Sequence, residues 1–304
     1  MSESGALPIG VFDSGVGGLT VVRALMERLP LESIVYFGDT ARVPYGVKSV
    51  ATIEHFTGQI TDHLLDKGVK MLIIACNTRG AVASHVVKEK AGDIPVLDVI
   101  DAGARAAVAE SRSRAIGVIG TPTTINSNAY ARRMHALDPN VRVYSQACPL
   151  FVPLVEEGWL EHQVTRLTAQ EYLKPVLAEN VDTLVLGCTH FPVLRAAISA
   201  VVGPHLALVD SAETTARVVA RELAARGLKV IGTATTVAEV CSKHTTVRVC
   251  VPPPHSAEQV PNALGCHTYT GHGWVLQACE VAGFAPAHEA SGASRVRLSR
   301  HTTV

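Results

Sequence analysis

Residues 71–78, MLIIACNT, and residues 183–190, TLVLGCTH, repeat one pattern at two places in the chain. In each, an apolar, β-prone run ends in a small residue and a cysteine, and polar side chains follow. Such a run, followed by a helical stretch, is typical of a buried strand in a parallel sheet. Cys76 and Cys188 are therefore predicted to stand at the carboxyl ends of two strands, 112 positions apart (188 − 76).

Strands and helices alternate on both sides of these two stretches. The pattern predicts strands at 8–12, 33–39, 69–76, 94–100, 115–120, 141–148, 182–188 and 205–211. Helices are expected between them, at 19–29, 50–68, 81–92, 102–112, 125–137 and 212–227. Strands that are apolar throughout and alternate with helices indicate an α/β protein with parallel sheets covered on both faces. Ligands of such sheets bind beyond the carboxyl ends of the strands.

The composition limits the class of protein. A chain of 304 residues fits two domains of ordinary size, and 47% hydrophobic with 18% charged residues is typical of a folded globular protein. The formal net charge of zero leaves a nucleic-acid partner unsupported. The N-terminal stretch lacks the pattern of a signal peptide, and no apolar run reaches the roughly 18 to 20 residues of a membrane span. We therefore expect a cytoplasmic protein with no membrane partner, in which seven cysteines without CxxC spacing form no disulfide framework.

The polar residues after the first cysteine suit an anionic ligand. A thiol just before a helix meets free backbone N–H groups and the positive end of the helix dipole, which favour the thiolate. Asn77 and Thr78 add hydrogen-bond donors beside Cys76. The alternative is a buried cysteine that acts as a small hydrophobic residue.

The second cysteine repeats the arrangement with a histidine nearby. Thr189 offers a donor, and His190 offers a base or a hydrogen-bond partner for Cys188. Zinc is the main competing interpretation, because cysteine and histidine are its ligands. However, Cys188 and His190 point to opposite sides if the strand continues, and the chain lacks CxxC and HxxxH spacings. The repeat of the whole pattern, an apolar strand followed by a cysteine and polar residues, favours a functional pair of thiols over a metal site.

The Gly-rich stretch DSGVGG, residues 13–18, resembles a phosphate loop only loosely. It lacks the GK[ST] ending and the GxGxxG spacing of nucleotide sites. A turn that approaches a small carboxylate closely fits better, with Asp13 and Ser14 projecting into the crevice. The alternative is that Asp13 only caps the following helix.

Other polar residues follow strands or begin helices. Asp39 ends the second strand and precedes the loop ARVPYG, residues 41–46. Thr121 and Thr124 lie near an expected helix start, where hydroxyl groups either cap the helix or bind a carboxylate. Glu156 and its neighbour Glu157 are expected at a helix start on the solvated surface.

Six motifs, in this order and spacing, carry a family resemblance over roughly residues 7–230: GVFDSGVGGLTV, YFGDTARVPYG, ACNT, GTPTTINSNAY, CPLFVPLVEEG and LGCTHFP. Together they resemble the cofactor-independent aspartate/glutamate racemase family, and within it the branch that acts on glutamate. The resemblance implies two α/β domains that face each other, with the active site in the cleft between them. It implies a first domain of residues 1–98 and 209–304, completed by the return of the chain, and a second domain of residues 99–208.

The resemblance also assigns roles to residues, with no cofactor and no metal. The implied catalytic residues are Cys76, Cys188, Asp13 and His190. The implied glutamate-binding residues are Asp13, Ser14, Pro44, Tyr45, Gly46, Asn77, Thr78, Thr121, Thr124 and Thr189, with Asp39 and Glu156 as accessory residues. The implied role is to supply D-glutamate for peptidoglycan synthesis, and a homodimer is compatible with it.

Two thiols suit racemisation, because the α-proton leaves one face of the substrate and another proton arrives on the opposite face. Three other interpretations stay open at this point. One is an aspartate racemase, one is a non-catalytic amino-acid-binding protein with two lobes, and one is a redox or zinc protein that uses the cysteines of the tail.

The chain departs from the family pattern at two places. Arg79 and Gly80 stand where the family usually has alanine and serine, so Arg79 is expected either to lower the pKa of Cys76 or to crowd the helix. On this comparison, activity should be weaker than in a variant with Arg79→Ala and Gly80→Ser. The tail from about residue 235 loses its periodicity and holds four of the seven cysteines, Cys241, Cys250, Cys266 and Cys279.

Overall fold

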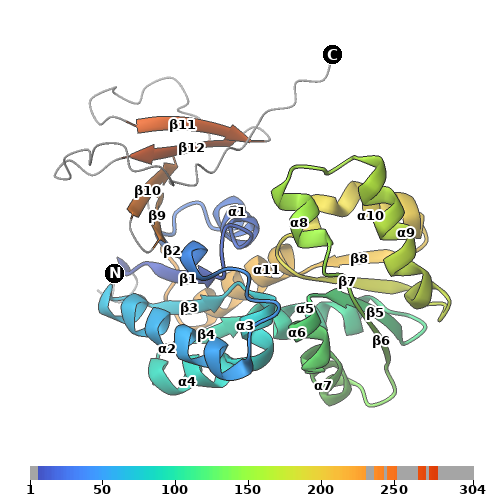
Figure 1. Ribbon diagram of the computed structural model, residues 1–304. Coiled ribbons are helices and arrows are strands. Elements are labelled where there is room, and N and C mark those ends of the chain that lie inside the picture. Colours follow the sequence, from blue (N-terminus) through green and yellow to red (C-terminus); the bar gives the residue numbers. More distant parts are fainter. Residues whose placement is uncertain (1–5, 231–235, 243–244, 252–265, 272–273, 280–304) are drawn as a thin grey trace.

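The computed structural model describes residues 6–230, 236–242, 245–251, 266–271 and 274–279 (Figure 1). Beyond residue 230 the description covers the backbone of four strands and no side chains, so the cysteines of the tail lie outside the described side chains. Two sheets stand side by side with helices around them (Figure 1). The expected α/β class with two facing parallel-sheet domains is confirmed.

The first sheet is built on four parallel strands, β1 (Ile9–Asp13), β2 (Ile34–Gly38), β3 (Met71–Ile74) and β4 (Val96–Asp98). Their order is β2-β1-β3-β4, and Ile9 pairs with both Ile34 and Met71. The helices of this half are α1 (Leu19–Arg28), α2 (Val50–Asp66), α3 (Asn77–Val82) and α4 (Ser84–Ala91), with a 3-10 turn, η2, at Thr40–Arg42. Every residue of β1 and β3 is buried, as expected for parallel strands covered on both faces.

Strands of the tail extend this sheet beyond β2. The strand β9 (Thr236–Ser242) runs parallel to β2. It is followed outward by β10 (Thr245–Val251), β12 (Trp274–Cys279) and β11 (Cys266–Gly271), all in antiparallel pairs. The irregular sequence after residue 235 thus continues the first sheet, which its periodicity did not indicate.

The second sheet has the order β6-β5-β7-β8, with all pairs parallel. Its strands are β5 (Ala115–Gly120), β6 (Arg142–Ala147), β7 (Thr183–Gly187) and β8 (Ala207–Asp210). The helices around it are α6 (Pro122–Asn126), α7 (Ala129–Leu137), α8 (Phe151–Glu156), α9 (Gln163–Leu177) and α10 (Arg195–Val202), with a 3-10 turn, η3, at Phe191–Leu194.

Two helices connect the halves. The chain enters the second sheet through α5 (Val99–Glu110) and returns through α11 (Ser211–Ala225), and these helices pack against each other (Figure 1). Ile100 and Ala104 of α5 belong to a core of the second sheet, whereas Ala216 and Val219 of α11 belong to the core of the first. The domain boundaries predicted from the sequence stay a prediction. Among the described residues, no helix is both long and apolar enough to cross a membrane.

Several boundaries differ from those expected, and three of the differences have a local cause. The helix predicted at 81–92 is two helices, because α3 begins directly after Cys76 and the chain bends at Ala83. The helix predicted at 125–137 is divided by Asn128, whose left-handed φ of 54° asparagine tolerates well. The strand predicted at 94–100 ends at Asp98, because its side chain accepts the backbone N–H of Asp101 at 2.8 Å and starts α5.

Candidate active site

Cys76 lies at the end of β3 as the residue before α3, and it is 4% exposed. Its Sγ donates to the hydroxyl of Ser14 at 3.6 Å. Burial first, and then the charge of Asp13, raise the pKa of Cys76 to about 12. The charge and the backbone N–H of Arg79 lower it, as expected for a residue at a helix start, but burial outweighs them. The helix start thus favours the thiolate of Cys76 as expected, but burial and Asp13 outweigh it and favour the neutral thiol.

Asp13 is fully buried where β1 turns into α1. Its Oδ2 accepts the backbone N–H of Gly18 at 2.7 Å and that of Gly15 at 3.4 Å. Its Oδ1 has no hydrogen-bond partner within residues 6–230. Oδ2 therefore stabilises the turn before α1, as the capping interpretation predicts. Oδ1 can still accept a hydrogen bond from a ligand.

Cys188 follows the last residue of β7 and is 6% exposed. Because the strand ends at Gly187, the chain turns and brings Nδ1 of His190 to 3.8 Å from the sulfur. The prediction that the two side chains point to opposite sides is wrong, and it would fail even in a continuing strand, because residues two apart on a strand lie on the same face. Cysteine and histidine therefore form a pair.

Glu156 holds the far side of the histidine ring, with Oε1 3.2 Å from Nε2 of His190. Burial lowers the pKa of His190, but its hydrogen bonds to Cys188 and Glu156 and the charges of Cys188 and Asp13 raise it to about 10. The ring is thus an imidazolium at neutral pH. Glu156 is the last residue of α8, not part of a helix start as predicted, and its pKa is lowered by the hydrogen bond to His190.

The boundary where residues of the first half contact residues of the second is called the seam below. Contacts across the seam bring the strand ends of the two sheets together. Thr20 of α1 donates from Oγ1 to the carbonyl of Thr189 at 3.2 Å. A Cβ atom on Gly17 would lie 2.5 Å from Oγ1 of Thr189 and 2.6 Å from the ring of His190. Since the charge of Asp13 acts on both Cys76 and His190, the two thiol regions share one neighbourhood.

A cluster of hydroxyl groups also spans the seam. Oγ1 of Thr78 lies 3.0 Å from that of Thr121 and 3.4 Å from that of Thr124. Next to it, Tyr130 of α7 donates to Oδ1 of Asn77 at 2.7 Å. The amide Nδ2 of Asn77 is buried and has no partner within residues 6–230. These neutral donors suit a carboxylate ligand, because buried donors without partners gain most from an acceptor.

The loop after β2 closes another side of the seam. Gly46 accepts from the backbone N–H of Thr123 at 3.2 Å, and a Cβ atom on Gly46 would lie 2.9 Å from Cβ of Thr121. Tyr45 is buried and donates to Asp39, whereas the neighbouring Pro44 is exposed. Asp39 therefore contacts this loop through the hydroxyl of Tyr45.

Sequence reasoning missed several residues of this region. Tyr36 and Tyr130 are buried, and burial is the first cause of their raised pKa values. The charge of the Cys76 sulfur contributes for Tyr36, and that of the Cys188 sulfur for Tyr130. Gly17 and Thr20 contact the opposite half. The quoted motifs contain Tyr36, Tyr130, Gly17 and Thr20, but only the tertiary contacts show what they touch. Cys148 directly follows β6, and burial raises its pKa also.

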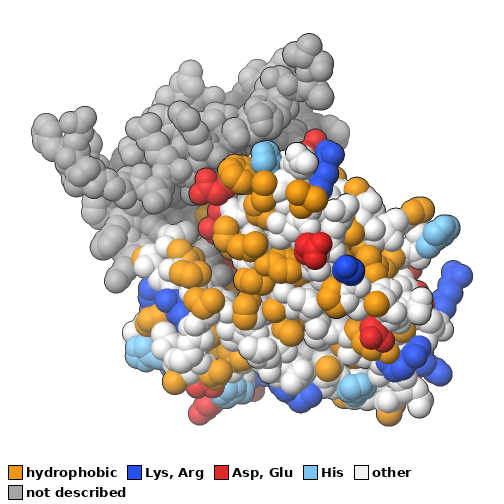
Figure 2. Space-filling view, turned by 45° about the vertical axis from the view of Figure 1, so that its right-hand side comes forward, with side chains coloured by type: hydrophobic (Ala, Val, Ile, Leu, Met, Phe, Trp, Pro, Cys, Tyr) orange, Lys and Arg blue, Asp and Glu red, His pale blue; other side chains and the backbone are white. Residues whose placement is uncertain are grey.

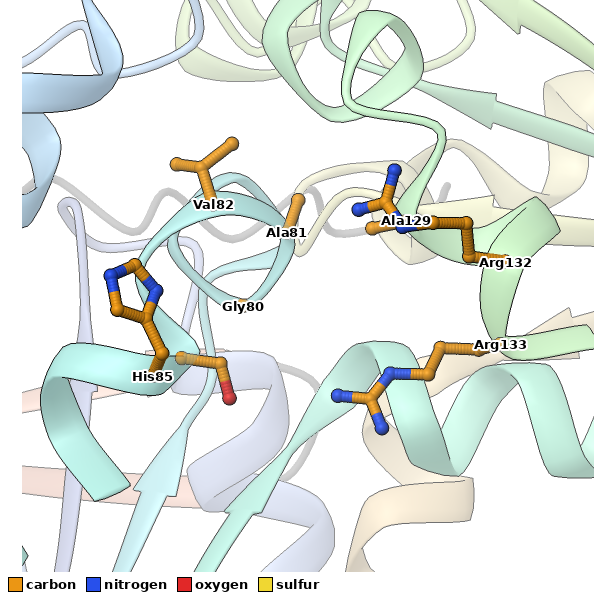
Figure 3. Close-up of a pocket in the computed structure, with 8 residues that line it drawn as sticks. Gly80, Ala81, Val82, His85, Ala129, Arg132 and Arg133 are labelled. Carbon is orange, nitrogen blue, oxygen red and sulfur yellow. The ribbon is translucent and has the colours of Figure 1, made fainter. Parts of the chain in front are cut away.

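The surface cavities lie away from the thiols. One polar cavity of about 200 Å³ is lined by residues of α3, α4 and α7, and in Figure 3 Arg132 and Arg133 extend from one side and His85 from the other. An apolar groove lies beside α8 and is lined by Leu150, Pro153, Leu154, Glu157, Trp159, Val164 and Thr168. Figure 2, which turns the side with α8, α9 and α10 forward, shows hydrophobic side chains gathered on that face. Neither cavity is lined by Cys76 or Cys188, which are both buried.

Comparison with known proteins gives consistent matches. The profile of the Asp/Glu/Hydantoin racemase family matches residues 19–219. A protein of Syntrophus aciditrophicus called glutamate racemase is 71% identical over 209 residues, which are 69% of this chain and 77% of the relative. A glutamate racemase of Neisseria meningitidis is 65% identical over 221 residues, 73% of this chain and 82% of the relative.

Among solved structures, the crystal structure of glutamate racemase from Francisella tularensis in complex with D-glutamate is similar. It matches with a TM-score of 0.75 and 42% identity and covers 79% of this chain and 89% of the other.

Proposed function

The chain belongs to the Asp/Glu/Hydantoin racemase family, and from this premise we propose that it interconverts L-glutamate and D-glutamate, with Cys76 and Cys188 as the two acid/base groups. The assignment of the two thiols rests on the difference between the residues around Cys76 and those around Cys188. The imidazolium of His190 stands 3.8 Å from the sulfur of Cys188, whereas the thiol of Cys76 is buried beside the carboxylate of Asp13. A two-base racemase needs one thiolate and one thiol at the start of each turnover.

The proposed starting state follows from these surroundings. We propose that Cys188, beside the ring of His190, is the base, and that buried Cys76 is the acid. The thiolate of Cys188 takes the α-proton from one face of glutamate, and the electron pair of the C–H bond stays on the α-carbon. The thiol of Cys76 then gives its proton to the opposite face. The enzyme is left with a thiol at Cys188 and a thiolate at Cys76, which is the form that acts on the other enantiomer.

Neutral hydrogen-bond donors hold the carboxylates of the substrate. The amide of Asn77 and the hydroxyl groups of Thr78, Thr121, Thr124 and Thr189 are buried and come from both halves. Donors fixed in an enclosed site stabilise the carbanionic transition state more than water does, because they need no reorganisation during the reaction. Ser14 and residues 44–46 complete the proposed substrate site.

Glutamate is proposed as the substrate rather than aspartate, since the relatives with 65–71% identity are called glutamate racemases. Purified protein should convert either enantiomer of glutamate to an equal mixture, as circular dichroism would record. It should also introduce deuterium at the α-carbon in heavy water. Faster turnover of aspartate would contradict the substrate, and binding of glutamate without α-exchange would identify a non-catalytic binding protein.

The cellular setting is part of the same proposal. The enzyme would supply, in the cytoplasm, the D-glutamate that peptidoglycan synthesis needs. Its gene should therefore restore growth of a bacterium that requires D-glutamate. A homodimer also stays a prediction, supported by the apolar groove beside α8, and sedimentation at several concentrations tests it.

A further inference from the structure

Arg79 is a fully buried arginine next to the thiol region and the largest of the fully buried side chains. It stands three positions after Cys76 in α3. Its Nη2 lies 3.0 Å from Oδ2 of Asp39. The guanidinium carbon lies 4.2 Å from the centre of the Tyr45 ring and 5.6 Å from that of Phe12. The side chain is thus held by one ion pair and by contacts with two aromatic rings.

This arrangement is costly for folding. Nε and Nη1 of Arg79 are buried and have no hydrogen-bond partner within residues 6–230. A buried ion pair is often no more stabilising than well-packed apolar residues of similar volume, and unpaired buried donors add to the cost. A methionine would fill the same space without this cost. The charge therefore calls for a role other than stability.

The surroundings of Cys76 indicate that role. Ser14 lies 3.6 Å from this sulfur. The charges of Asp13, the last residue of β1, and of Arg79 in α3 act on the thiol in opposite directions, and the charge of the sulfur acts on Tyr36 of β2. Among these groups Arg79 is the cation, and it opposes the negative charge of Asp13. Cys188 has His190 in direct contact for the same purpose, whereas Cys76 has no histidine beside it among the described residues.

We propose that Arg79 is a positioning residue for the Cys76 half of the site: a cation, fixed by Asp39 and the ring of Tyr45, that stabilises the Cys76 thiolate when it forms. This inference rests on the proposed racemase activity. The family pattern led us to expect that Arg79→Ala with Gly80→Ser would raise the activity. The proposed role of Arg79 predicts a lower activity for this variant. On the present geometry that double variant is slower than the wild type.

The test separates the two thiols by measuring α-proton exchange in heavy water, where each acts alone. In a Cys188→Ser background, exchange depends on Cys76, and adding Arg79→Met should lower its rate about tenfold, as expected when the thiolate becomes harder to form by about one pKa unit. The rise of this exchange with pH should move to higher pH by a similar amount. Adding Arg79→Lys, which keeps the charge, should recover most of the rate.

The matched control is Arg79→Met in a Cys76→Ser background, where exchange depends on Cys188 and should change less than twofold. The melting temperature of Arg79→Met should equal or exceed that of the wild type, which excludes a loss through unfolding. An equal loss in both backgrounds, or none in either, would overturn the inference and leave Arg79 a packing residue. Wild-type protein without racemase activity would instead contradict the proposed function.

Discussion

The regions around Cys76 and Cys188 share a sequence pattern but differ in electrostatic surroundings. Each cysteine follows a buried strand of a parallel sheet and each is almost fully buried. The charge of Asp13 raises the pKa of Cys76, whereas the sulfur of Cys188 lies 3.8 Å from Nδ1 of His190. The comparison teaches that the strand positions the thiol, while the residues packed around it decide its protonation.

This difference gives the proposed mechanism its direction. Two identical surroundings would leave both sulfurs protonated or both ionised, and neither state moves a proton through the substrate. With His190 on one side and Asp13 on the other, the resting enzyme holds one acid and one base. The predictions below break or sharpen this contrast.

The largest effect is expected from removing one thiol. Cys76→Ser and Cys188→Ser should each lower racemisation roughly a thousandfold in both directions, since each direction needs an acid and a base. Each variant should still exchange the α-proton of one enantiomer, and a different one in each case. Mass spectrometry of glutamate recovered from heavy water measures this.

Cys148→Ala serves as the matched control, because Cys148 is also buried at a strand end but its Sγ donates to the carbonyl of Gln146 at 3.7 Å. This variant should keep both exchange reactions. If Cys76→Ser and Cys188→Ser lose exchange of the same enantiomer, the two thiols do not serve opposite faces.

The second effect concerns the cation beside Cys188. His190→Asn removes the charge that stabilises this thiolate, so exchange by Cys188 should fall roughly a hundredfold. Glu156→Gln should cost only about threefold, because its side chain is 52% exposed and contributes one partner of the ring. Measured in the Cys76→Ser background, a loss in His190→Asn no greater than in Glu156→Gln would contradict the role of the imidazolium.

A third and smaller effect is expected at the seam. Gly17→Ala places a methyl group 2.5 Å from Oγ1 of Thr189 and 2.6 Å from the His190 ring, so the two halves must part slightly. We expect kcat/KM to fall about tenfold with a small change in melting temperature. Gly58→Ala is the control, because its methyl group would meet the flexible end of Lys90 at 3.2 Å and make an ordinary contact with Val86 at 3.6 Å. Equal activity of the two variants would show that the seam tolerates the added volume.

The smallest effect is on stability as a function of pH. The pKa of His190 is raised to about 10, so the folded protein binds a proton that the unfolded chain has released. Its contribution is complete below about pH 6.5 and disappears as the pH rises through about 10. The gap in melting temperature between wild type and His190→Asn should therefore narrow from pH 6 to pH 10. A gap independent of pH would indicate that the ring is neutral when folded.

The sequence was sufficient for most of the strands, because buried parallel strands are apolar throughout and end at polar residues such as Asp13 and Asp39. It was insufficient for protonation. Burial of Cys76 against Asp13 is a tertiary fact, and it reverses the effect of the helix start. The pairing of Cys188 with His190 depends on where β7 ends, which apolar content does not fix. Glu156 was assigned to the wrong end of its helix for the same reason.

The two connecting helices run between the sheets in opposite senses of the chain, α5 after β4 of the first sheet and α11 after β8 of the second, and they pack against each other. Two neighbouring connections resist twisting and sliding of one half over the other more than a single connection would, and they leave bending as the easiest motion. On the proposed function, entry and release of glutamate would therefore open the site by bending about these helices, and the same covalent path would bring the two cysteines back to the same arrangement after each turnover.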